Sequence, residues 1–504
     1  MPSCIFAATV LATLPVRTAY QGESFFALSV AVGGNELPEK PVLKTIMAEL
    51  VEAQVIRYQE YKPMGVEWMQ EIPVGWEVRK LKYVADINVN TLPETTNDTY
   101  SFRYLDIGNV TLGSIDYNVE PITFKEAPSR ARRIIGKGDI LVSTVRTYLK
   151  AIAQVEEDTT NLIVSTGFAV VSARQGLDKR FLLYVSVSEN FVDTISAYST
   201  GVSYPAITAT ELGNMPVWFP VSLEEQRLIA RFLDDKTAQI DQLITQKQQM
   251  LMLLREERAA LINHVMTKGL DAAAPLRDSG VEWLGEVPAH WEVKKLKWIA
   301  EIQGGIALSA GKKLENPIMR PYLRVANVQD GYLDLAEVKT VEVEAEQVGR
   351  YALHKGDLLM NEGGDNDKLG RGCVWQGEIE PCLHQNHVFA VRLFNGYNPE
   401  WLNLITVTEG ARTHFMTRAK QSTNLASISS SNIKELSVLL PPVAEQQEIM
   451  ALVAEETARV AEVTATINQE IGLLQEYRAA LIAEAVTGQL DVRNYVPAQV
   501  PVLM

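Results

Sequence analysis

The 504-residue sequence is poor in the features that mark secreted and membrane proteins. It has three cysteines, Cys4, Cys373 and Cys382, which are too few for a disulfide framework and indicate a reducing compartment. No run of about 18 apolar residues occurs, so no transmembrane helix is expected. Basic residues are also in deficit, since 47 Lys and Arg stand against 62 Asp and Glu and give a net charge of −15. Taken over the whole chain, that charge argues against a polyanionic ligand.

Sequence motifs of catalysis are absent as well. A phosphate-binding loop needs GxxxxGK[ST], and the nearest segment, Gly305–Lys313, has the wrong spacing and ends in lysine. Neither a GxGxxG nor an HExxH pattern occurs, and the Asn-Pro-Pro-aromatic or Asp-Pro-Pro-aromatic tetrapeptide of an amino-methyltransferase is missing. Cys373, Cys382, His384 and His387 have a spacing that fits no common zinc site, so no metal is predicted. The missing active site favours a binding or adaptor role.

The sequence is, however, one unit built twice. GVEWMQEIPVGWEVRKLKYVADI, starting at Gly65, returns without a gap as GVEWLGEVPAHWEVKKLKWIAEI, starting at Gly280, 215 residues further on. RAALI occurs at Arg258–Ile262 and again at Arg478–Ile482. KGDILVS, from Lys137, resembles KGDLLMN 218 residues later. Between these segments the match fades, so we expect two related domains with divergent middles and better-matched tails.

Both tails have the periodicity of long α-helices, with apolar residues at steps of mostly three, four and seven. The apolar positions are Ile229, Leu233, Ile240, Ile244, Leu251, Leu254, Leu261 and Val265 in the first tail, and Ile449, Val453, Val460, Val463, Ile467, Ile471, Leu474, Leu481 and Ala485 in the second. Pro220 and Pro441–Pro442 stand just before the tails, where a helix can begin. A helix from Ser222 to His264 would be about 65 Å long. Narrow stripes of matched length favour an antiparallel coiled-coil pair over two helices that each pack on their own domain.

The divergent middles alternate short β-type runs with turns rich in Gly, Asn and Asp, such as NEGGDND at Asn361–Asp367. This pattern predicts a mixed α/β (α+β) fold with many loops. Because loops on a rigid scaffold usually carry recognition, the middles are the expected binding regions.

Residues 1–46 lie outside the repeat. Their opening, MPSCIFAATVLATLPV, is mildly apolar but lacks the basic start of a secretory signal, since Arg17 is the only basic residue before Lys40. Two interpretations stay open, a secretory signal and a non-essential extension from an upstream start. The residues favour the extension, with Met47 or Met64 nearer the functional beginning.

The acidic charge is unevenly distributed. The second helical tail, Val443–Asp491, holds nine acidic residues against two basic ones, so much of the excess lies on the scaffold. An acidic scaffold leaves room for local basic loops that bind phosphates. Such clusters are Arg130, Arg132, Arg133, Lys137, Arg146 and Lys150 in the first middle, and Lys312, Lys313, Arg320, Arg324, Arg412, Arg418 and Lys420 in the second. For any one cluster, a solvated surface is the alternative explanation.

The combination of motifs is familiar. The paired GVEW segments, the KGDIL and KGDLL segments, the Pro-then-Glu-Gln helix start and RAALI together resemble the DNA-specificity (S) subunit of type I restriction–modification systems. The resemblance covers about residues 64–492. The chain departs from the pattern before residue 64, and has Gln446-Gln447 where the first repeat has Glu225-Gln226.

The resemblance implies two target-recognition domains, separated by an antiparallel pair of long coiled-coil helices and related by pseudo-two-fold symmetry. The expected divisions are an N-terminal extension at 1–63, recognition domains at 64–220 and 279–440, a central spacer helix at 221–271, a distal spacer helix at 441–492 and a tail at 493–504. Such a subunit is not an enzyme. It binds double-stranded DNA in the cytoplasm, reads one half of a bipartite asymmetric site with each domain, and holds two methyltransferase subunits and, in some assemblies, two restriction subunits. S-adenosylmethionine and ATP are expected on those partners, and no cofactor on this chain.

Polar residues on loops of the two middles are the candidates for reading bases, with basic residues setting the register on phosphates. The candidates are Arg146, Tyr148, Lys150, Thr166, Ser199, Thr200 and Tyr204 in the first domain, with Arg130, Arg132 and Arg133 as basic neighbours, and Asn361, Glu362, Asp365, Gln385, Asn386, Gln421, Ser422 and Asn424 in the second, with Lys312 and Arg324. For each of them a plain surface or turn residue is the alternative.

Two other functions remain open at this stage. A duplicated protein-interaction scaffold would have no affinity for DNA even with partner subunits present. An enzyme with an unrecognised site would turn over substrate as the isolated chain.

Overall fold

The computed structural model describes residues 57–66, 69–157, 160–201, 204–307, 315–364, 369–421 and 426–496. They divide into two compact units. Unit 1 holds the described residues up to Lys247 and from Asn468 onward, and unit 2 holds Gln248–Ile467. Among the helices of the described residues, none combines the length and the apolar character that crossing a bilayer requires.

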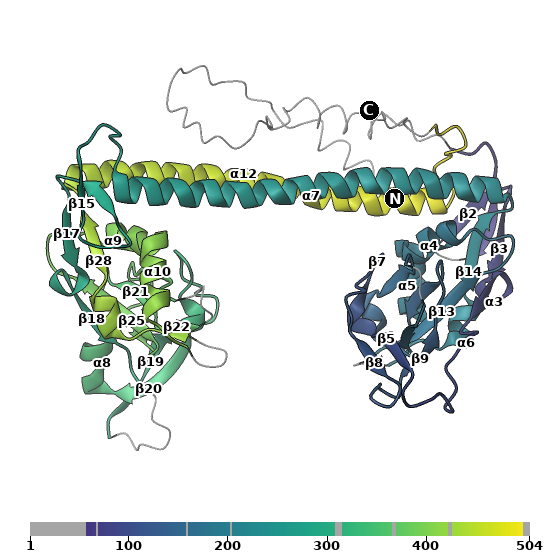
Figure 1. Ribbon diagram of the computed structural model, residues 1–504, viewed down its shortest axis with the longest axis horizontal. Coiled ribbons are helices and arrows are strands. Elements are labelled where there is room, and N and C mark those ends of the chain that lie inside the picture. Colours follow the sequence, from purple (N-terminus) through teal and green to yellow (C-terminus); the bar gives the residue numbers. More distant parts are fainter. Residues whose placement is uncertain are drawn as a thin grey trace. The chain divides into compact units, whose positions relative to one another are not determined.

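Unit 1 contains two four-stranded sheets (Figure 1). In spatial order, the first consists of β11 (Ile152–Gln154), β10 (Ile140–Ser143), β13 (Phe168–Ala173) and β4 (Ala85–Ile87), and the second of β8 (Pro121–Thr123), β5 (Ser101–Leu105), β12 (Leu162–Ser165) and β9 (Ala131–Ile134). Three strand pairs complete it: β1 (Tyr61–Val66) with β2 (Met69–Pro73), β3 (Trp76–Lys80) with β14 (Pro216–Pro220), and β6 (Val110–Thr111) with β7 (Ser114–Ile115). Its short helices are α3 (Leu81–Val84), η1 (Ile107–Asn109), η2 (Thr147–Leu149), α4 (Lys179–Val187), α5 (Glu189–Tyr198) and α6 (Ala209–Asn214).

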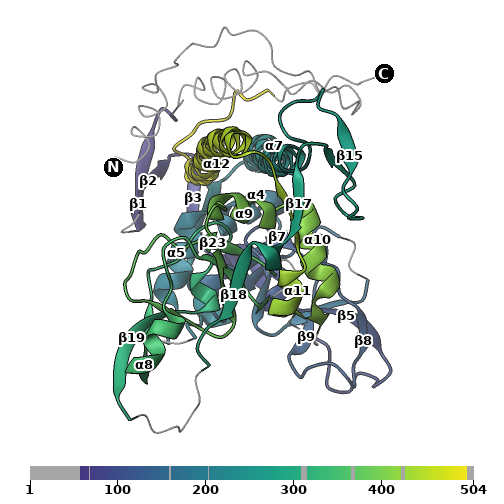
Figure 2. The ribbon, with the colours of Figure 1, turned by 90° about the vertical axis from the view of Figure 1, so that its left-hand side faces the viewer.

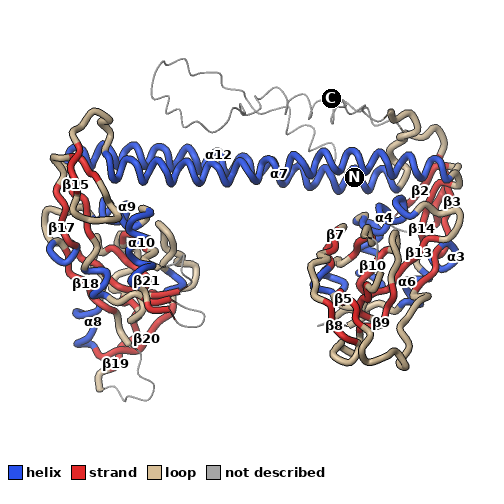
Figure 3. The backbone as a smooth tube through the Cα atoms, viewed as in Figure 1, coloured by secondary structure: helices blue, strands red, loops and turns tan. Residues whose placement is uncertain are grey.

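Unit 2 has the same arrangement of sheets and helices, except that the sheet equivalent to the second sheet of unit 1 has three strands (Figure 3). Its four-stranded sheet consists of β18 (Ala300–Gly304), β25 (Val388–Leu393), β21 (Leu358–Asn361) and β23 (Gly372–Val374), and two three-stranded sheets of β20 (Lys339–Glu344), β19 (Pro317–Leu323) and β24 (Leu383–His384), and of β22 (Gly363–Gly364), β27 (Ala426–Ser427) and β26 (Lys420–Gln421). The pairs are β15 (Leu276–Asp278) with β16 (Glu286–Pro288), and β17 (Glu292–Lys295) with β28 (Ser437–Leu440). The short helices are η3 (Leu296–Trp298), η4 (Val325–Asn327), α8 (Ala345–Tyr351), α9 (Pro399–Thr406), α10 (Glu409–Arg418) and α11 (Ser430–Lys434). The prediction of two related α/β domains is confirmed.

Local sequence explains these elements. Every residue of β10 (ILVS) and of β21 (LLMN) is buried, as expected for apolar runs covered on both faces. The side chain of Asp178 caps α4 by accepting from the amides of Arg180 and Phe181. Asn398 caps α9 in the same way, and Pro399 occupies the first helical position, where its missing N–H costs nothing.

The two long helices are α7 (Leu223–Lys268) and α12 (Val443–Val486). Every apolar position predicted for their stripes is buried or half-buried. In unit 1, Arg478 donates to Asp241 and Lys247 donates to Glu470. The residue number on α12 falls as the number on α7 increases, so the two helices run in opposite directions. In unit 2, Arg258 donates to Thr457 at 3.1 Å. The predicted antiparallel pairing is thus present within each unit, where the two helices lie side by side (Figure 2).

A tryptophan fastens each domain to the helix pair. In unit 1 the fully buried Trp76 donates from Nε1 to Glu225 near the start of α7, at 3.0 Å, and packs against Gly488 beyond the end of α12. In unit 2 the equivalent Trp291 packs against Gly269 beyond the end of α7. The matched GWE and HWE segments are therefore structural, which explains their retention in both repeats.

Replacing Trp76 by Phe should destabilise unit 1 more than Trp291→Phe destabilises unit 2. Both indoles are buried, so both variants lose similar apolar contact. Only Trp76 donates to a carboxylate, whereas Trp291 Nε1 has no hydrogen-bond partner among the described residues. A hydrogen bond to a charged group contributes about 1.5–3 kcal/mol. Hydrogen exchange resolved by unit would measure the two losses, and equal losses would contradict a stabilising role of the Trp76 bond.

The shared KGD segments form turns that brace the central sheets. Asp139 accepts from the hydroxyl of Ser172 at 2.7 Å, while the buried Asp357 accepts two hydrogen bonds from Arg392, at 2.8 and 2.7 Å. The glycine before each aspartate has a φ of 90° or 94°, a left-handed conformation that only glycine adopts readily. These segments are therefore structural, which agrees with their occurrence in both repeats.

Residues 57–63 pack into unit 1, although the sequence placed them before the first domain. The hydroxyl of Tyr58 donates to Glu225 at 2.8 Å, and that of Tyr61 donates to the carbonyl of Gly488 at 2.9 Å. β1 pairs with β2 in the same starting register as β15 with β16. Residues 57–63 and the segment after α12 thus build in unit 1 what the linker after α7 builds in unit 2. Of the extension predicted at 1–63, residues 1–56 lie outside the described residues.

Candidate nucleic-acid interface

Three loops of unit 1 meet at one end of the central sheet. They are the β10–β11 turn, the β12–β13 turn and the segment between α5 and α6. Thr144 donates from its amide and its hydroxyl to the carbonyl of Gly167, at 2.8 and 2.9 Å. Ile207 in turn donates from its amide to the carbonyl of Thr144, at 2.9 Å. We call this arrangement of residues 144–151, 166–167, 199–201 and 204–207 the first loop junction.

The first loop junction gathers most of the residues predicted for the first domain, namely Arg146, Tyr148, Lys150, Thr166, Ser199, Thr200 and Tyr204. The guanidinium of Arg146 lies 5.2 Å from the centre of the Tyr204 ring. The hydroxyl of Thr147 donates to that of Ser199 at 2.9 Å and ties two of the loops together. Residues that lie 60 positions apart in sequence thus form one surface.

The predicted arginines lie beside this junction, with Arg132 and Arg133 on β9 and Arg130 directly before it. Thr166 donates from its amide to the carbonyl of Arg130 at 2.8 Å, which places the exposed Arg130 next to the β12–β13 turn. Arg132 is half-buried with its guanidinium 4.5 Å from the Phe124 ring, and Arg133 donates to the hydroxyl of Thr91 at 3.1 Å. Of the three, Arg130 is therefore the most available to a ligand.

Unit 2 contains the same junction at equivalent backbone positions. Glu362 donates from its amide to the carbonyl of His387 at 2.9 Å, and Ile428 donates to the carbonyl of Glu362 at 2.8 Å. We call residues 361–364, 385–387, 420–421 and 426–428 the second loop junction. It gathers the predicted residues Asn361, Glu362, Gln385, Asn386 and Gln421. Lys312, Asp365, Ser422 and Asn424 lie outside the described residues.

Two residues of unit 2 that were predicted to read bases are not exposed. Asn361 is only 4% exposed, and its side-chain amide donates to the carbonyl of Val328 at 2.9 Å, so it holds the loop from inside. Arg324 follows β19, is half-buried and lies 3.7 Å from Glu337. Because Gln385 donates to the carbonyl of Leu323, Arg324 borders the second loop junction.

His387 belongs to the second loop junction, but the sequence did not predict it as a residue that reads bases. It is exposed, and its Nδ1 lies 2.6 Å from the Glu362 carboxylate, which fixes the orientation of both side chains. The sequence had suggested His387 only for a zinc set. The signal that could have found it is its alignment with Gly167, 220 residues earlier, directly before the matched strand.

Cys373, Cys382 and His384, the other residues considered for a zinc site, are buried in unit 2. Burial raises the pKa of the thiols of Cys373 and Cys382 to about 12. His384 is buried, with Nδ1 2.6 Å from the carbonyl of Val388, and burial lowers its pKa. Within the described ranges, no group of three or more His, Cys, Asp or Glu side chains is placed to hold a metal ion.

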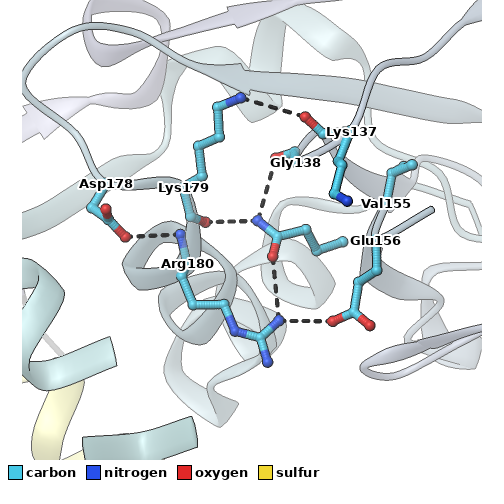
Figure 4. A pocket seen from close by; sticks show the side chains of 8 residues that line it. Lys137, Gly138, Val155, Glu156, Asp178, Lys179 and Arg180 are labelled. Carbon is cyan, nitrogen blue, oxygen red and sulfur yellow. Dashed lines mark hydrogen bonds and ion pairs between the residues drawn. The ribbon is translucent and has the colours of Figure 1, made fainter. Parts of the chain in front are cut away.

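A shallow cleft of about 550 Å³ in unit 1 lies away from the loop junction, between the KGD turn and α4 (Figure 4). Arg180 dominates it and donates to Glu156 at 2.9 Å and to Asp234 on α7 at 2.6 Å. Lys179 reaches the carbonyl of Lys137 across the cleft. Since Arg180 and Asp178 pair with Asp234 and Arg227 of α7, the cleft joins the domain to the helix.

The comparisons with known proteins agree with this geometry. The family model for the type I restriction modification DNA specificity domain matches residues 73–252 and again residues 288–472. The chain belongs to this family. Each matched range of the specificity-domain family contains one complete loop junction, so the duplication seen in the sequence is a duplication of the family's domain.

Individual relatives point the same way. The chain is 26% identical over 323 residues to the type I restriction enzyme EcoKI specificity subunit of Escherichia coli strain K12, an alignment that covers 62% of this chain and 66% of that protein, just under two thirds. It is 21% identical over 435 residues to the MjaIX specificity subunit of Methanocaldococcus jannaschii, covering 84% of this chain and 95% of that protein. A solved chain from work on complex assembly and conformational transition of the type I R-M system superposes with a TM-score of 0.65 at 22% identity, covering 83% and 99% of the two chains. That likeness establishes the fold.

Proposed function

We propose that the chain is the specificity subunit of a type I restriction–modification complex, in which each loop junction reads one half of a bipartite, asymmetric DNA site. The observation that carries this is the pair of junctions. The backbone bonds Thr144–Gly167 and Glu362–His387 are equivalent, while the side chains around them differ. Two readers with one geometry and different side chains are suited to two different half-sites.

The side chains have the chemistry that base readout needs. In the first junction, Arg146 can donate two hydrogen bonds to guanine, and Thr166 can bond either way. The hydroxyl of Ser199 donates to the carbonyl of Ile195, so toward a base it can only accept. In the second, Glu362 can accept from the amino group of cytosine, and Asn386 can bond adenine. Arg130, on the rim of the first junction, suits a phosphate that fixes the register. Asn361 takes a supporting role, because its amide is buried.

Local charge reconciles this function with the net charge of −15. The nine acidic residues of Val443–Asp491 lie on the second helical tail, whereas the first loop junction carries Arg146 and Lys150, with Arg130 beside it. A protein of acidic net charge can bind DNA through such a local basic surface.

Two methyltransferase subunits are the proposed partners, one for each repeat. Surfaces kept in both repeats suit a partner present twice. Tyr83 and Trp298 occupy equivalent positions, and both are largely exposed, with the ammonium groups of Lys82 and Lys297 5.3 and 5.6 Å from their rings. Burial does not explain that retention, whereas a shared docking surface does. The outward helix face is a weaker candidate, since Asp235 on it accepts a hydrogen bond from Tyr495 at 3.0 Å.

The remaining activities belong to the partners in this proposal. We assign adenine methylation, with S-adenosylmethionine, to the methyltransferase subunits. ATP-dependent cleavage would belong to restriction subunits where these join. The cytoplasmic location expected from the sequence follows from this assignment.

The test is to reconstitute the chain with its methyltransferase partner and select DNA from a random-sequence library by mobility shift. We expect one bipartite site with two different halves at a fixed spacing, methylated in both halves. Absence of DNA affinity with the partner present would favour a protein-interaction scaffold. Turnover by the isolated chain would identify an enzyme instead.

The native mass of the assembled complex tests the partner number. We expect two methyltransferase subunits per chain at saturation, because the repeats present equivalent surfaces. A single subunit per chain at saturating partner concentration would contradict this arrangement. A variant with Val74→Ala, on an exposed turn beside the start of α7, serves as a matched surface control.

A further inference from the structure

Two neighbouring apolar side chains project from the first loop junction. Tyr148 is 56% exposed and Leu149 is 47% exposed, at the tip of the β10–β11 turn. Large apolar groups side by side in water forgo the free energy that burial would supply. A contiguous exposed apolar feature of this kind marks a binding surface more often than an accident of folding.

The tip is held rigidly. The buried Thr147 anchors it through its hydroxyl to Ser199, at 2.9 Å, and through its amide to the carbonyl of Pro205, at 3.3 Å. Residues Thr147–Leu149 form the single turn η2, closed on both sides by Arg146 and Lys150. These two residues have φ of 52° and 51°, left-handed conformations that cost conformational free energy in residues other than glycine.

The surroundings of the tip are cationic. Lys150 directly follows Leu149 in sequence, Arg146 lies two residues before Tyr148, and both are exposed. The Arg146 guanidinium lies over the ring of Tyr204, which is itself exposed. An apolar projection flanked by cations complements DNA, whose stacked apolar bases lie between two rows of phosphates.

We propose that the Tyr148–Leu149 tip is a wedge that enters one base-pair step of the first half-site and unstacks it. The idea rests on the proposed DNA-reading function and adds a local distortion of the DNA to it. Burying the two side chains between bases would offset the loss of stacking, while Arg146 and Lys150 hold the adjacent phosphates. The strained turn keeps the wedge extended before DNA arrives, so little ordering is needed on binding.

The second domain lacks an equivalent in the residues described. Its matching turn begins Asn361-Glu362-Gly363-Gly364, and the only large apolar side chain described there, Leu369, is buried. The distortion is therefore expected in one half-site only, which makes the other half an internal control.

The experiment uses the chain assembled with its methyltransferase partner and duplexes of the selected site. 2-Aminopurine, whose fluorescence rises when it is unstacked, replaces one base at a time through both half-sites. Apart from the methylated adenine of each half, which a methyltransferase flips out of the stack, fluorescence with the wild-type chain should rise several-fold at one step of the first half-site and at no position of the second. Leu149→Ala and Tyr148→Ala should abolish the rise and weaken binding by about tenfold each, the loss expected for one stacking contact. The control is Val74→Ala, since Val74 is also 47% exposed but lies in the β2–β3 turn beside the start of α7.

The outcomes separate the wedge from the proposed function. Sequence-specific binding without a fluorescence change at any position other than the methylated adenines would overturn the wedge and leave the specificity function standing. Failure of the complex to select any DNA would overturn both. If Leu149→Ala released the partner subunit while the thermal unfolding of the chain stayed normal, the tip would be a protein-docking site, and the wedge would again be wrong.

Discussion

Seven residues inserted into both long helices should lengthen the preferred DNA spacer by about three base pairs and leave both half-site sequences unchanged. Seven residues add about 10.5 Å to an α-helix, and successive base pairs are about 3.4 Å apart. An insertion of seven also keeps the apolar stripe nearly in phase, with about 20° of drift. We propose that the helix pair acts as a ruler that sets the distance between the two readers, and the expectation follows from that proposal.

The insertions belong after Lys247 in α7 and after Ile467 in α12, where the sequence passes from one unit to the other. Contacts inside each unit, such as that between Asp241 and Arg478, are then kept. Methylation-site mapping reads the spacer and both halves together. As a control, the same seven residues are placed in the exposed turn at Asn395, between β25 and α9. An unchanged spacer, or an altered half-site sequence, would refute the ruler role of the helices.

The helices were the most predictable part of this fold. Their apolar stripes follow the α-helical repeat of 3.6 residues per turn, which can be recognised from local sequence alone. Positions such as Ile229 and Val453 are buried, as this pattern requires. The repeat added the pairing, because two matched stripes of equal length have each other as natural partners. The repeat also showed that Trp76 and Trp291 are retained, but their role in attaching each domain, through Gly488 and Gly269, was not predicted.

Residues 57–63 escaped prediction for a different reason. They occur once, so the repeat gave no sign of them, and the partners of Tyr58 and Tyr61 lie more than 160 residues away at Glu225 and Gly488. Local propensity carries no information about such contacts. A comparison of the linker after α7 with the chain before β2 would have been needed.

The candidate site was predicted by composition and only partly by position. Polar residues in loops were the sequence's candidates, and the structure brings several of them together, since Thr144, Gly167 and Ile207 join three loops. Whether a side chain faces inward depends on tertiary packing. Asn361 has the turn-like sequence of an exposed reader, yet it ends a buried strand and bonds Val328. Whether any of these residues contacts a base stays a prediction.

The two readers should be separable by single substitutions. Arg146→Ala should alter preference only in the first half-site, at a cost of about 1–3 kcal/mol at one position if the guanidinium bonds guanine. If Arg146 contacts a phosphate instead, binding should weaken almost equally for all sequences, and the salt dependence should flatten by about one unit. Arg174→Ala is the matched control, because Arg174 is exposed and paired with Asp86 at the other end of β13.

Glu362→Gln should act only on the second half-site. A carboxylate accepts from the amino group of cytosine, whereas a glutamine amide both donates and accepts, as adenine requires. His387 holds the Glu362 carboxylate at 2.6 Å, so the replaced side chain starts from the same position. We therefore expect preference at one position to move from cytosine toward adenine, with the first half unchanged.

Library selection and methylation mapping on both variants would report the two halves at once. Glu378→Gln, an exposed carboxylate in a turn of unit 2 away from the second loop junction, is the control for the charge change. A shift in the wrong half would exchange the assignment of domains to half-sites. If Glu362→Gln and Arg146→Ala both left affinity, salt dependence and sequence preference as in the wild type, the loop junctions would not be the DNA-reading surface, because neither of these two junction residues would have a partner in the complex.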